Sequence, residues 1–228
     1  MKQDVFDIEQ SPLGDLFSSD IVHYAECMIS EAPEKGLPEE EACLEGVSAS
    51  RKREFRAGRL CARNALRLLG AECVPIIPSE QRGPTWPEGV IGSISHTREY
   101  CAAVVGRSSD VYSLGLDVER SDRLKPRLWR LVLRDAEREW VSHFSEQDQV
   151  HWATLIFSAK EAFYKYQFPY TSTWVSFKQA EVSVDPQAGL FELRIVDDFS
   201  SLFPKDTVLI GRFAFAGPYV FTGLAAQL

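Results

Sequence analysis

The sequence predicts a mixed α+β fold built from two similar halves. Each half of the 228-residue chain combines helical periodicity with several short strand-like segments. The segments YCAAVVG, from Tyr100, and YVFTGLAA, from Tyr219, suit equivalent strands of two related halves. A chain of this length with 45% hydrophobic and 25% charged residues can bury a sizeable core. We therefore predict one half over residues 1–113 and a second over residues 114–228.

The clearest element of the first half is a helix from about Ser48 to Leu69. Its apolar side chains recur at spacings of three, four or seven residues, and Gly70 suits the C-cap. Residues 1 to about 45 mix acidic residues with short apolar runs, and within them EAPEKGLPEEEACLEG suits an acidic loop with a helix start. The segment VPIIPSEQRGPTWPEG is too rich in Pro and Gly for regular structure. Short strands are expected at Val90–Ser95 and Tyr100–Val105.

The second half opens on a strand and continues with two helices and four strands. In the segment SLGLDVE, apolar residues alternate with polar or small ones, as in a half-buried strand. That strand is expected over Tyr112–Glu119, followed by helices at Arg127–Trp140 and Trp152–Tyr166 and by strands at Trp174–Val184, Leu190–Val196, Val208–Ala214 and Tyr219–Ala225.

Composition excludes several classes of protein. A net charge of −8 argues against general nucleic-acid binding. The sequence contains no run of 18 apolar residues, so no transmembrane helix is expected. The acidic start MKQDVFDIEQSPLGD lacks the apolar core of a signal peptide. The five cysteines are scattered, without a CxxC pair for zinc or a disulfide framework. We expect a monomer in the reducing cytoplasm.

The predicted first helix is densely basic in an acidic chain. Seven basic residues stand against Glu54 within residues 51–67, RKREFRAGRLCARNALR. Like charges four residues apart cost a helix a few tenths of a kcal/mol per pair, so we expect an anionic partner. Because the arginine fork suits phosphate, the face either binds phosphate or is simply solvated. The face comprises Lys52, Arg56, Arg59, Arg63 and Arg67, on the side opposite Phe55 and Leu66.

The segment GSISHT follows at residues 92–97. Gly92 lets a ligand approach the backbone, and Ser95 and His96 supply hydrogen-bonding groups. His96 is either a phosphate contact at a strand end or a structural residue of the turn. Ser95 and His96 do not indicate a hydrolase, because no Gly-x-Ser-x-Gly elbow precedes them.

Charged residues also interrupt the largely apolar helical segment FSAKEAFYK, residues 157–165. Glu161 and Lys165 have the favoured spacing and orientation of a helical ion pair, which alone describes a surface pair. Charges on an apolar helix usually have a purpose, and Lys160 adds a third, so a functional role is the alternative.

Asp117 and Glu119 share one face at the end of the strand in SLGLDVE, because strand side chains alternate between faces. Two carboxylates held so close repel each other. Glu161 would add a third hard oxygen ligand, and such a set suits Mg²⁺, with Mn²⁺ as a possible substitute. The alternative is an ordinary capped or surface pair of carboxylates.

The order and spacing of four segments resemble a known family. GRLCAR, GPTWPEGVIGSISH, LGLDVE and FSAKEAFYK are similar to the motifs of surfactin-type (group II) 4'-phosphopantetheinyl transferases. The resemblance covers about residues 48–185 and is closer to the siderophore-associated subgroup, of enterobactin and mycobacterial type. It implies two similar α+β halves related by a pseudo-twofold axis, with coenzyme A in the cleft between them.

The resemblance also implies residue roles. The magnesium carboxylates would be Asp117, Glu119 and Glu161, and Glu161 would also deprotonate the carrier serine, directly or through a metal-bound water. The catalytic set would be Glu161, Lys165 and His96. Coenzyme A would be held by Arg51 or its neighbours Lys52 and Arg53, and by Arg59, Ser95, His96, Lys160 and Lys165. Arg82 stands where relatives often have a lysine, which makes this contact a departure from the family pattern.

The implied reaction transfers 4'-phosphopantetheine from coenzyme A to a serine of an apo acyl or peptidyl carrier protein, with Mg²⁺, and releases 3',5'-ADP. Siderophore or other nonribosomal peptide or polyketide synthesis would use the product. One alternative is a non-catalytic module that binds coenzyme A or a nucleotide. Another is a metal-dependent phosphatase or nuclease, which usually needs more metal ligands than this chain offers.

A second basic cluster follows the strand that carries Asp117 and Glu119, in ERSDRLKPRLWRLVLRDAERE, residues 119–139. Carrier proteins present their serine on an acidic helical surface, so this cluster would steer their approach. An ordinary amphipathic helix with its apolar side in the core is the alternative.

Overall fold

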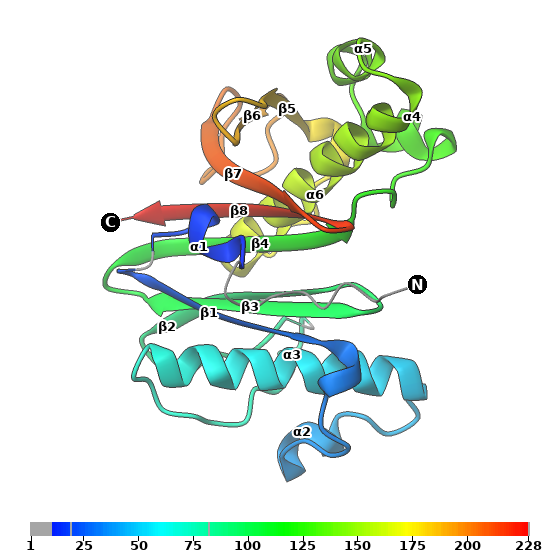
Figure 1. The fold of residues 1–228 in the computed structure, drawn as a ribbon. Helices are drawn as coiled ribbons and strands as arrows, with labels where there is room; N and C mark the ends of the chain where they lie inside the picture. The colour runs from blue at the N-terminus through cyan, green and yellow to red at the C-terminus, as the bar shows by residue number, and fades with distance from the viewer. Residues whose placement is uncertain (1–10, 19, 82, 228) are drawn as a thin grey trace.

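Two antiparallel β-sheets, of three and five strands, carry the fold (Figure 1). The computed structural model describes residues 11–227 except 19 and 82. The three-stranded sheet has the order β1-β3-β2, and the five-stranded sheet has the order β4-β8-β7-β6-β5. Every pairing is antiparallel, and no helix of the described residues is both long and apolar enough to cross a membrane.

The first sheet consists of β1 (Val22–Met28), β2 (Val90–His96) and β3 (Tyr100–Arg107). The long helix α3 (Ala49–Leu68) covers one face of it, below the sheet in Figure 1. Ser48 caps the helix by accepting a hydrogen bond from the Arg51 amide, and Gly70 follows its end with a φ of 66°. The expected helix and the two expected strands of this half are confirmed, with bounds that differ by one or two residues.

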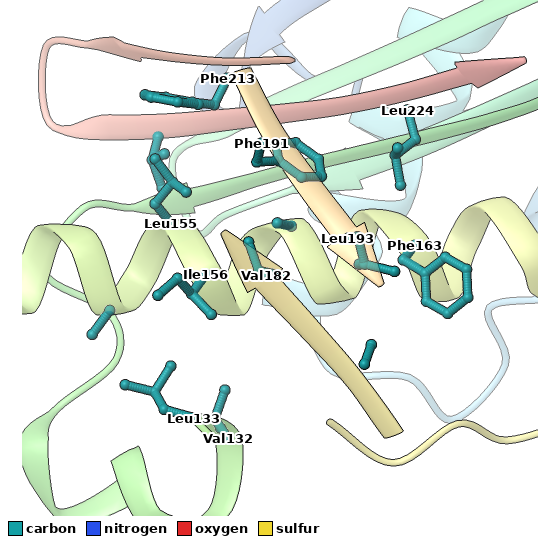
Figure 2. Packing of buried hydrophobic residues seen from close by; sticks show 14 of the residues in the cluster. Val132, Leu133, Leu155, Ile156, Phe163, Val182, Phe191, Leu193, Phe213 and Leu224 are labelled. Carbon is teal, nitrogen blue, oxygen red and sulfur yellow. The ribbon is translucent and has the colours of Figure 1, made fainter. Parts of the chain in front are cut away.

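The second sheet consists of β4 (Val111–Arg120), β5 (Ala180–Asp185), β6 (Leu190–Ile195), β7 (Val208–Ala216) and β8 (Tyr219–Gln227). Helix α6 (Glu146–Thr171) lies against it and is longer than expected. Figure 2 shows Leu155 of this helix on the side of Phe213 of β7, Ile156 near Val182 of β5, and Phe163 beside Leu193 of β6.

The two halves share an order of elements. In each, the first strand is followed by a long helix, and the first strand pairs with the last strand, β1 with β3 and β4 with β8. The mixed α+β class is confirmed, while the pseudo-twofold axis stays a prediction. The boundary expected after residue 113 falls inside β4, which belongs wholly to the second sheet.

Helix α6 runs antiparallel to β4 with a regular register. A Cβ atom on Gly115 would lie 2.1 Å from the Ala162 carbonyl oxygen, so only glycine permits this approach. Two residues along the strand, Asp117 meets Ser158, four residues earlier on the helix. Because two strand residues advance about 6.6 Å and four helical residues about 6 Å, the steps match, and they fix Asp117 relative to α6.

Serine side chains join the two sheets. The Leu116 amide donates to Ser93 Oγ and the Val118 amide donates to Ser95 Oγ, each at 3.1 Å. Both serines come from β2, so their hydroxyls stand in for a backbone ladder between β2 and β4. The segment GSIS is therefore part of the connection between the halves as well as a candidate ligand contact.

Two expected elements are wrong. The helix expected over Arg127–Trp140 is broken into a 3₁₀ turn (Pro126–Leu128), α4 (Trp129–Val132) and α5 (Asp135–Ser142). The chain is extended at Leu133, which is fully buried, and the Glu137 carboxylate accepts from the Arg134 amide to start α5. The strand expected from Trp174 begins only at Ala180, after a 3₁₀ turn (Phe177–Gln179).

The acidic N-terminal region contains more structure than expected. It forms α1 (Leu13–Leu16), β1, a 3₁₀ turn (Ile29–Glu31) and α2 (Pro38–Ala42). Strand β1 was missed because it pairs only with β3 and only its first residue is fully buried, so its alternation is weak.

Candidate functional site

Asp117 is the centre of the site. It lies on β4 with 4% of its surface exposed, and each carboxylate oxygen has partners. Oδ1 accepts from Lys165 Nζ at 2.8 Å and from Ser95 Oγ at 3.0 Å, while Oδ2 accepts from Ser158 Oγ at 2.8 Å. Asp117 therefore joins groups from β2, β4 and α6.

Lys165 ties the two halves together at the same point. Its ammonium group donates to Ser95 Oγ at 2.8 Å and to the Leu116 carbonyl at 3.0 Å, besides Asp117. Its side chain stays 26% exposed, so the positive charge is placed at the edge of the buried cluster. The structure thus brings together Ser95, Asp117 and Lys165, three residues singled out in the sequence.

The charge of Asp117 acts on two further carboxylates, those of Glu119 and Glu161. Burial, and then the charge of Asp117, raise the pKa of Glu119 to about 8. The same two causes, in the same order, raise the pKa of Glu161 above its usual range. Because both shifts report carboxylates that repel each other in a partly buried site, a cation would relieve them.

The donor chemistry fits a divalent cation. Three carboxylates supply hard oxygen ligands of the kind that Mg²⁺ takes, and their repulsion is unrelieved apart from Lys165 and Arg123. Within residues 11–227, leaving aside 19 and 82, no three His, Cys, Asp or Glu side chains already form a ligand group. The three carboxylates are therefore chemically suitable for a cation, but they are not yet arranged around one point. Asp117 is instead hydrogen-bonded to Lys165 and to two serines.

A cleft of about 640 Å³ opens between the two halves. Its first-half wall includes Glu54 and His96, and its second-half wall includes Glu119 and the residues that follow it. Five basic residues line the cleft, one from the first half and four from the second: Arg98, Arg120, Arg123, Lys125 and Arg127. The cleft is large enough for a small-molecule ligand, and its lining combines these basic residues with four carboxylates, those of Glu54, Glu99, Glu119 and Asp122.

His96 occupies one wall of the cleft in a defined state. Arg51 Nη1 lies 2.8 Å from His96 Nε2, and because arginine only donates, Nε2 is the acceptor. The proton of the neutral ring is then on Nδ1, 3.2 Å from the Thr97 carbonyl. Burial and the Arg51 charge lower the pKa of His96. Arg51 is also paired with Glu54 at 2.9 Å.

Three further arginines of α3 are bound inside the first half. Glu41 holds Arg56 through two hydrogen bonds, and Glu40 holds the buried Arg63. The expected anionic partner of this face is therefore helix α2. Arg59 is 8% exposed and donates from Nε to the Ile76 carbonyl at 2.7 Å. Its guanidinium lies 4.0 Å from the centroid of the Phe55 ring, so the prediction that this face lies opposite Phe55 is wrong.

Lys160 is also committed internally. It is 3% exposed, and its ammonium donates to the carbonyls of Val132 and Phe177 and to Glu137 at 2.8 to 3.0 Å. Burial lowers its pKa to about 8. In this arrangement all three donors are satisfied by protein groups, and none is directed to a ligand. Lys52 makes no ion pair within the described part of the chain, and Arg82 lies outside the described residues.

Sequence reasoning missed three groups of this site. Ser158 lies inside the quoted segment FSAKEAFYK, yet its bond to Asp117 could be foreseen only from the register of α6 and β4. Thr222 follows from the same packing, since it is bonded to Ser158. Glu54 is the single acid of the basic segment, and no sequence pattern shows that it faces Arg51 and His96.

Comparison with known proteins decides the family. Residues 39–106 match a family model described as the 4'-phosphopantetheinyl transferase N-terminal domain, and residues 113–212 match that of the 4'-phosphopantetheinyl transferase superfamily. The chain is 36% identical over 193 residues to the 4'-phosphopantetheinyl transferase PptT of Mycobacterium tuberculosis, covering 82% of this chain and 85% of that protein. This protein belongs to the 4'-phosphopantetheinyl transferase superfamily.

Two further relatives agree with this membership. The 4'-phosphopantetheinyl transferase Svp of Streptomyces mobaraensis is 39% identical over 161 residues, which are 70% of this chain and 65% of that relative. Enterobactin synthase component D of Escherichia coli is 34% identical over 173 residues, which are 75% of this chain and 71% of that relative. The expected family and the expected enzyme class, a 4'-phosphopantetheinyl transferase, are confirmed.

Proposed function

We propose that this transferase moves the 4'-phosphopantetheine group of coenzyme A to a serine of apo acyl or peptidyl carrier proteins. The serine oxygen would bond to the phosphorus that carries pantetheine, while the bond from that phosphorus to the bridging oxygen breaks. The leaving group is 3',5'-ADP, and the serine proton passes to a base. The observation that carries this proposal is the cleft that holds His96 and Glu119 on opposite walls in a member of this superfamily.

Three carboxylates would hold the cation: Asp117, Glu119 and Glu161. When bound, Mg²⁺ supplies charge neutralisation at the pyrophosphate, which is what phosphoryl transfer mainly needs. Mn²⁺ offers the same ligand preferences. Glu161 also serves as the base for the carrier serine, and its raised pKa suits a carboxylate that accepts a proton.

Two basic residues and a neutral histidine would contact phosphate. Lys165 offsets negative charge on the departing phosphate from its position beside Asp117. His96 can donate only through Nδ1, unless binding of the substrate changes its bond to Arg51. Arg51 is exposed and contacts the cleft-lining His96, which supports a role for it in binding the 3'-phosphate, with Lys52 and Arg82 as further contacts.

The surroundings of Arg59 and Lys160 argue against their implied contacts with coenzyme A. The buried bonds of Arg59 to Ile76 and of Lys160 to Glu137 favour structural roles for both side chains. Ser95, by contrast, contacts both Asp117 and Lys165 and keeps its proposed role beside the reacting groups.

The pathway is proposed from the relatives. One of them is named for enterobactin synthesis, which favours carriers of siderophore or other nonribosomal peptide or polyketide assembly. The enzyme would act as a monomer in the cytoplasm, where coenzyme A and apo carriers meet.

Intact-mass spectrometry tests the function. The protein is incubated with coenzyme A, Mg²⁺ and a panel of apo carriers, and the gain of one phosphopantetheine group and the release of 3',5'-ADP are recorded. A non-catalytic binding module would leave every carrier unchanged, and a phosphatase would release inorganic phosphate instead. Reactions with a chelator in place of Mg²⁺ test the requirement for a divalent cation.

A further inference from the structure

Asp117 is held by a chain of buried hydroxyls that the proposed reaction does not use. Ser158 Oγ lies 2.8 Å from Asp117 Oδ2 and 2.8 Å from Thr222 Oγ1. Ser158 and Thr222 have no exposed surface, and Asp117 is 4% exposed. Such a network is costly to bury unless its members satisfy one another.

The direction of the chain follows from proton count. An ionised Asp117 only accepts, so Ser158 donates its single proton to Oδ2. Ser158 then has no proton left for Thr222, and Thr222 donates to Ser158. The order Thr222 to Ser158 to Asp117 fixes one carboxylate oxygen, while Lys165 and Ser95 occupy the other.

Three elements lock this arrangement. Asp117 and Thr222 are directly opposite each other in the pairing of β4 with β8. Ser158 reaches both from α6, which the missing side chain of Gly115 allows to lie against β4. The hydroxyls are therefore held by packing rather than by solvent, which is the condition for orienting a ligand oxygen.

We infer that Ser158, backed by Thr222, is a positioning residue that orients the Asp117 carboxylate for the divalent cation. This inference rests on the proposed function, since it assumes that Asp117 is a metal ligand. Ser158 would not contact substrate or cation itself. Groups that hydrogen-bond a ligating side chain typically contribute 10- to 100-fold to metal affinity or activity.

A matched serine exists on the same interface. Ser113 lies on β4, facing α6, is 2% exposed, and donates to the Tyr166 carbonyl of α6. Among the residues that the structure describes, it has no hydrogen bond to a carboxylate. Ser113→Ala therefore removes a buried serine hydroxyl between β4 and α6 without touching Asp117.

The test measures binding of Mn²⁺ to the whole protein saturated with coenzyme A and without carrier, by electron paramagnetic resonance of the free ion. We expect Ser158→Ala to weaken Mn²⁺ binding about 10-fold or more, and Ser113→Ala to change it less than twofold. Thr222→Val should weaken Mn²⁺ binding about threefold, and Thr222→Ser, which keeps the hydroxyl, should bind Mn²⁺ like wild type. The Michaelis constant for coenzyme A at saturating Mg²⁺ should be unchanged.

Several results would overturn the inference. These are wild-type protein that binds no Mn²⁺, Ser158→Ala that binds like wild type, or Ser113→Ala that loses as much as Ser158→Ala. If Ser158→Ala does not fold, Thr222→Val decides, because it removes only the hydroxyl while keeping the shape. If no carrier is modified but the Mn²⁺ pattern holds, the proposed function is wrong and the positioning role stands.

Discussion

The backbone of α6 approaches β4 most closely where Ala162 lies over Gly115. A Cβ atom on Gly115 would be 2.1 Å from the Ala162 carbonyl oxygen and 2.9 Å from the Tyr166 Cβ. Glu161 precedes Ala162, and Asp117 lies two residues beyond Gly115. The distance between two of the proposed metal ligands is therefore set by the absence of a side chain.

Gly115→Ala should consequently damage stability and metal binding together. The added methyl group must push α6 from β4, and overpacking of this kind costs about 1–3 kcal/mol or more. For a chain of this length that is a fall in Tm of several degrees. Calorimetry and Mn²⁺ titration check both effects. Gly83→Ala, whose Cβ would meet only Ser79 Oγ at 3.8 Å, is the control. A variant with normal stability and metal binding would show that the helix contact is not limiting.

The sequence predicted most of the regular elements because their periodicity is strong. Helix α3 and strands β2 and β3 pack a clear apolar stripe against one core. The break at Leu133 was not predictable, since it depends on that side chain reaching the core of the second sheet. Strand β1 was missed because an edge strand with mostly half-buried residues gives little pattern.

Glu161→Gln should abolish most turnover while leaving coenzyme A binding within several-fold of wild type. Glutamine keeps the size of the side chain but is neither an anionic ligand nor a base, and general-base catalysis is typically worth about 10²–10⁴-fold in rate. Single-turnover kinetics with carrier, together with calorimetric titration of coenzyme A, separate the two effects. Glu139→Gln, at an exposed position of α5, serves as control. Retention of half the normal rate by Glu161→Gln would contradict the assignment.

Arg51→Ala should raise the Michaelis constant for coenzyme A about 10- to 100-fold, because a charge-assisted phosphate contact is worth about 1.5–3 kcal/mol. Dephospho-coenzyme A, which lacks the 3'-phosphate, should be used equally well by variant and wild type. Lys52→Ala and Arg53→Ala, measured in parallel, show whether a neighbour makes the contact instead. Equal losses with both substrates would mean that Arg51 acts through His96 and not on the 3'-phosphate.

The candidate site illustrates what sequence patterns miss. Asp117, Lys165 and Ser95 were found because they stand in short motifs, and the structure brings them within hydrogen-bond distance. The internal partners of Arg59 and Lys160 come from distant segments, Ile76 and Glu137. No local pattern reports such contacts, so an arginine that stabilises a loop and one that binds phosphate look alike in sequence.

The ion pair between Glu41 and Arg56 predicts a pH dependence of stability. Hydrogen bonds from Arg56 and from the Gly36 amide lower the pKa of Glu41 from 4.5 to about 2. The unfolded chain therefore binds the proton more readily, so the contribution of Glu41 is present above pH 4.5 and is lost as the pH falls toward 2. The pair is partly exposed to solvent, which keeps its contribution to stability small.

Urea unfolding of Glu41→Gln and wild type at several pH values checks this. The variant should be less stable at pH 7 and about pH 5.5, and the difference should shrink near pH 3.5. Glu39→Gln, an exposed neighbour on α2, should show no such difference. A deficit that is the same at every pH would mean that Glu41 acts through packing rather than charge.

The basic residues that follow β4 differ in whether a carboxylate pairs with them. Arg120, Arg123 and Lys125 are paired with nearby carboxylates, and Arg123 lies 3.7 Å from Glu119. Arg127 and Arg130 are exposed and make no ion pair within the part of the chain that the structure describes. They lie on the 3₁₀ turn and α4, on which Leu131 is 68% exposed, while Leu128, Trp129 and Val132 pack against the core.

Arg127→Glu combined with Arg130→Glu should therefore raise the Michaelis constant for an acidic carrier about 10-fold at low salt and flatten its salt dependence, because complementary charge speeds association and is screened by salt. The Michaelis constant for coenzyme A should change less than twofold. Reversal of Arg194 and Arg212, exposed on β6 and β7, changes the net charge equally and is the control. Steady-state kinetics against carrier concentration at low and moderate salt give the answer. If both double variants behave alike, only net charge matters, and the carrier docks elsewhere.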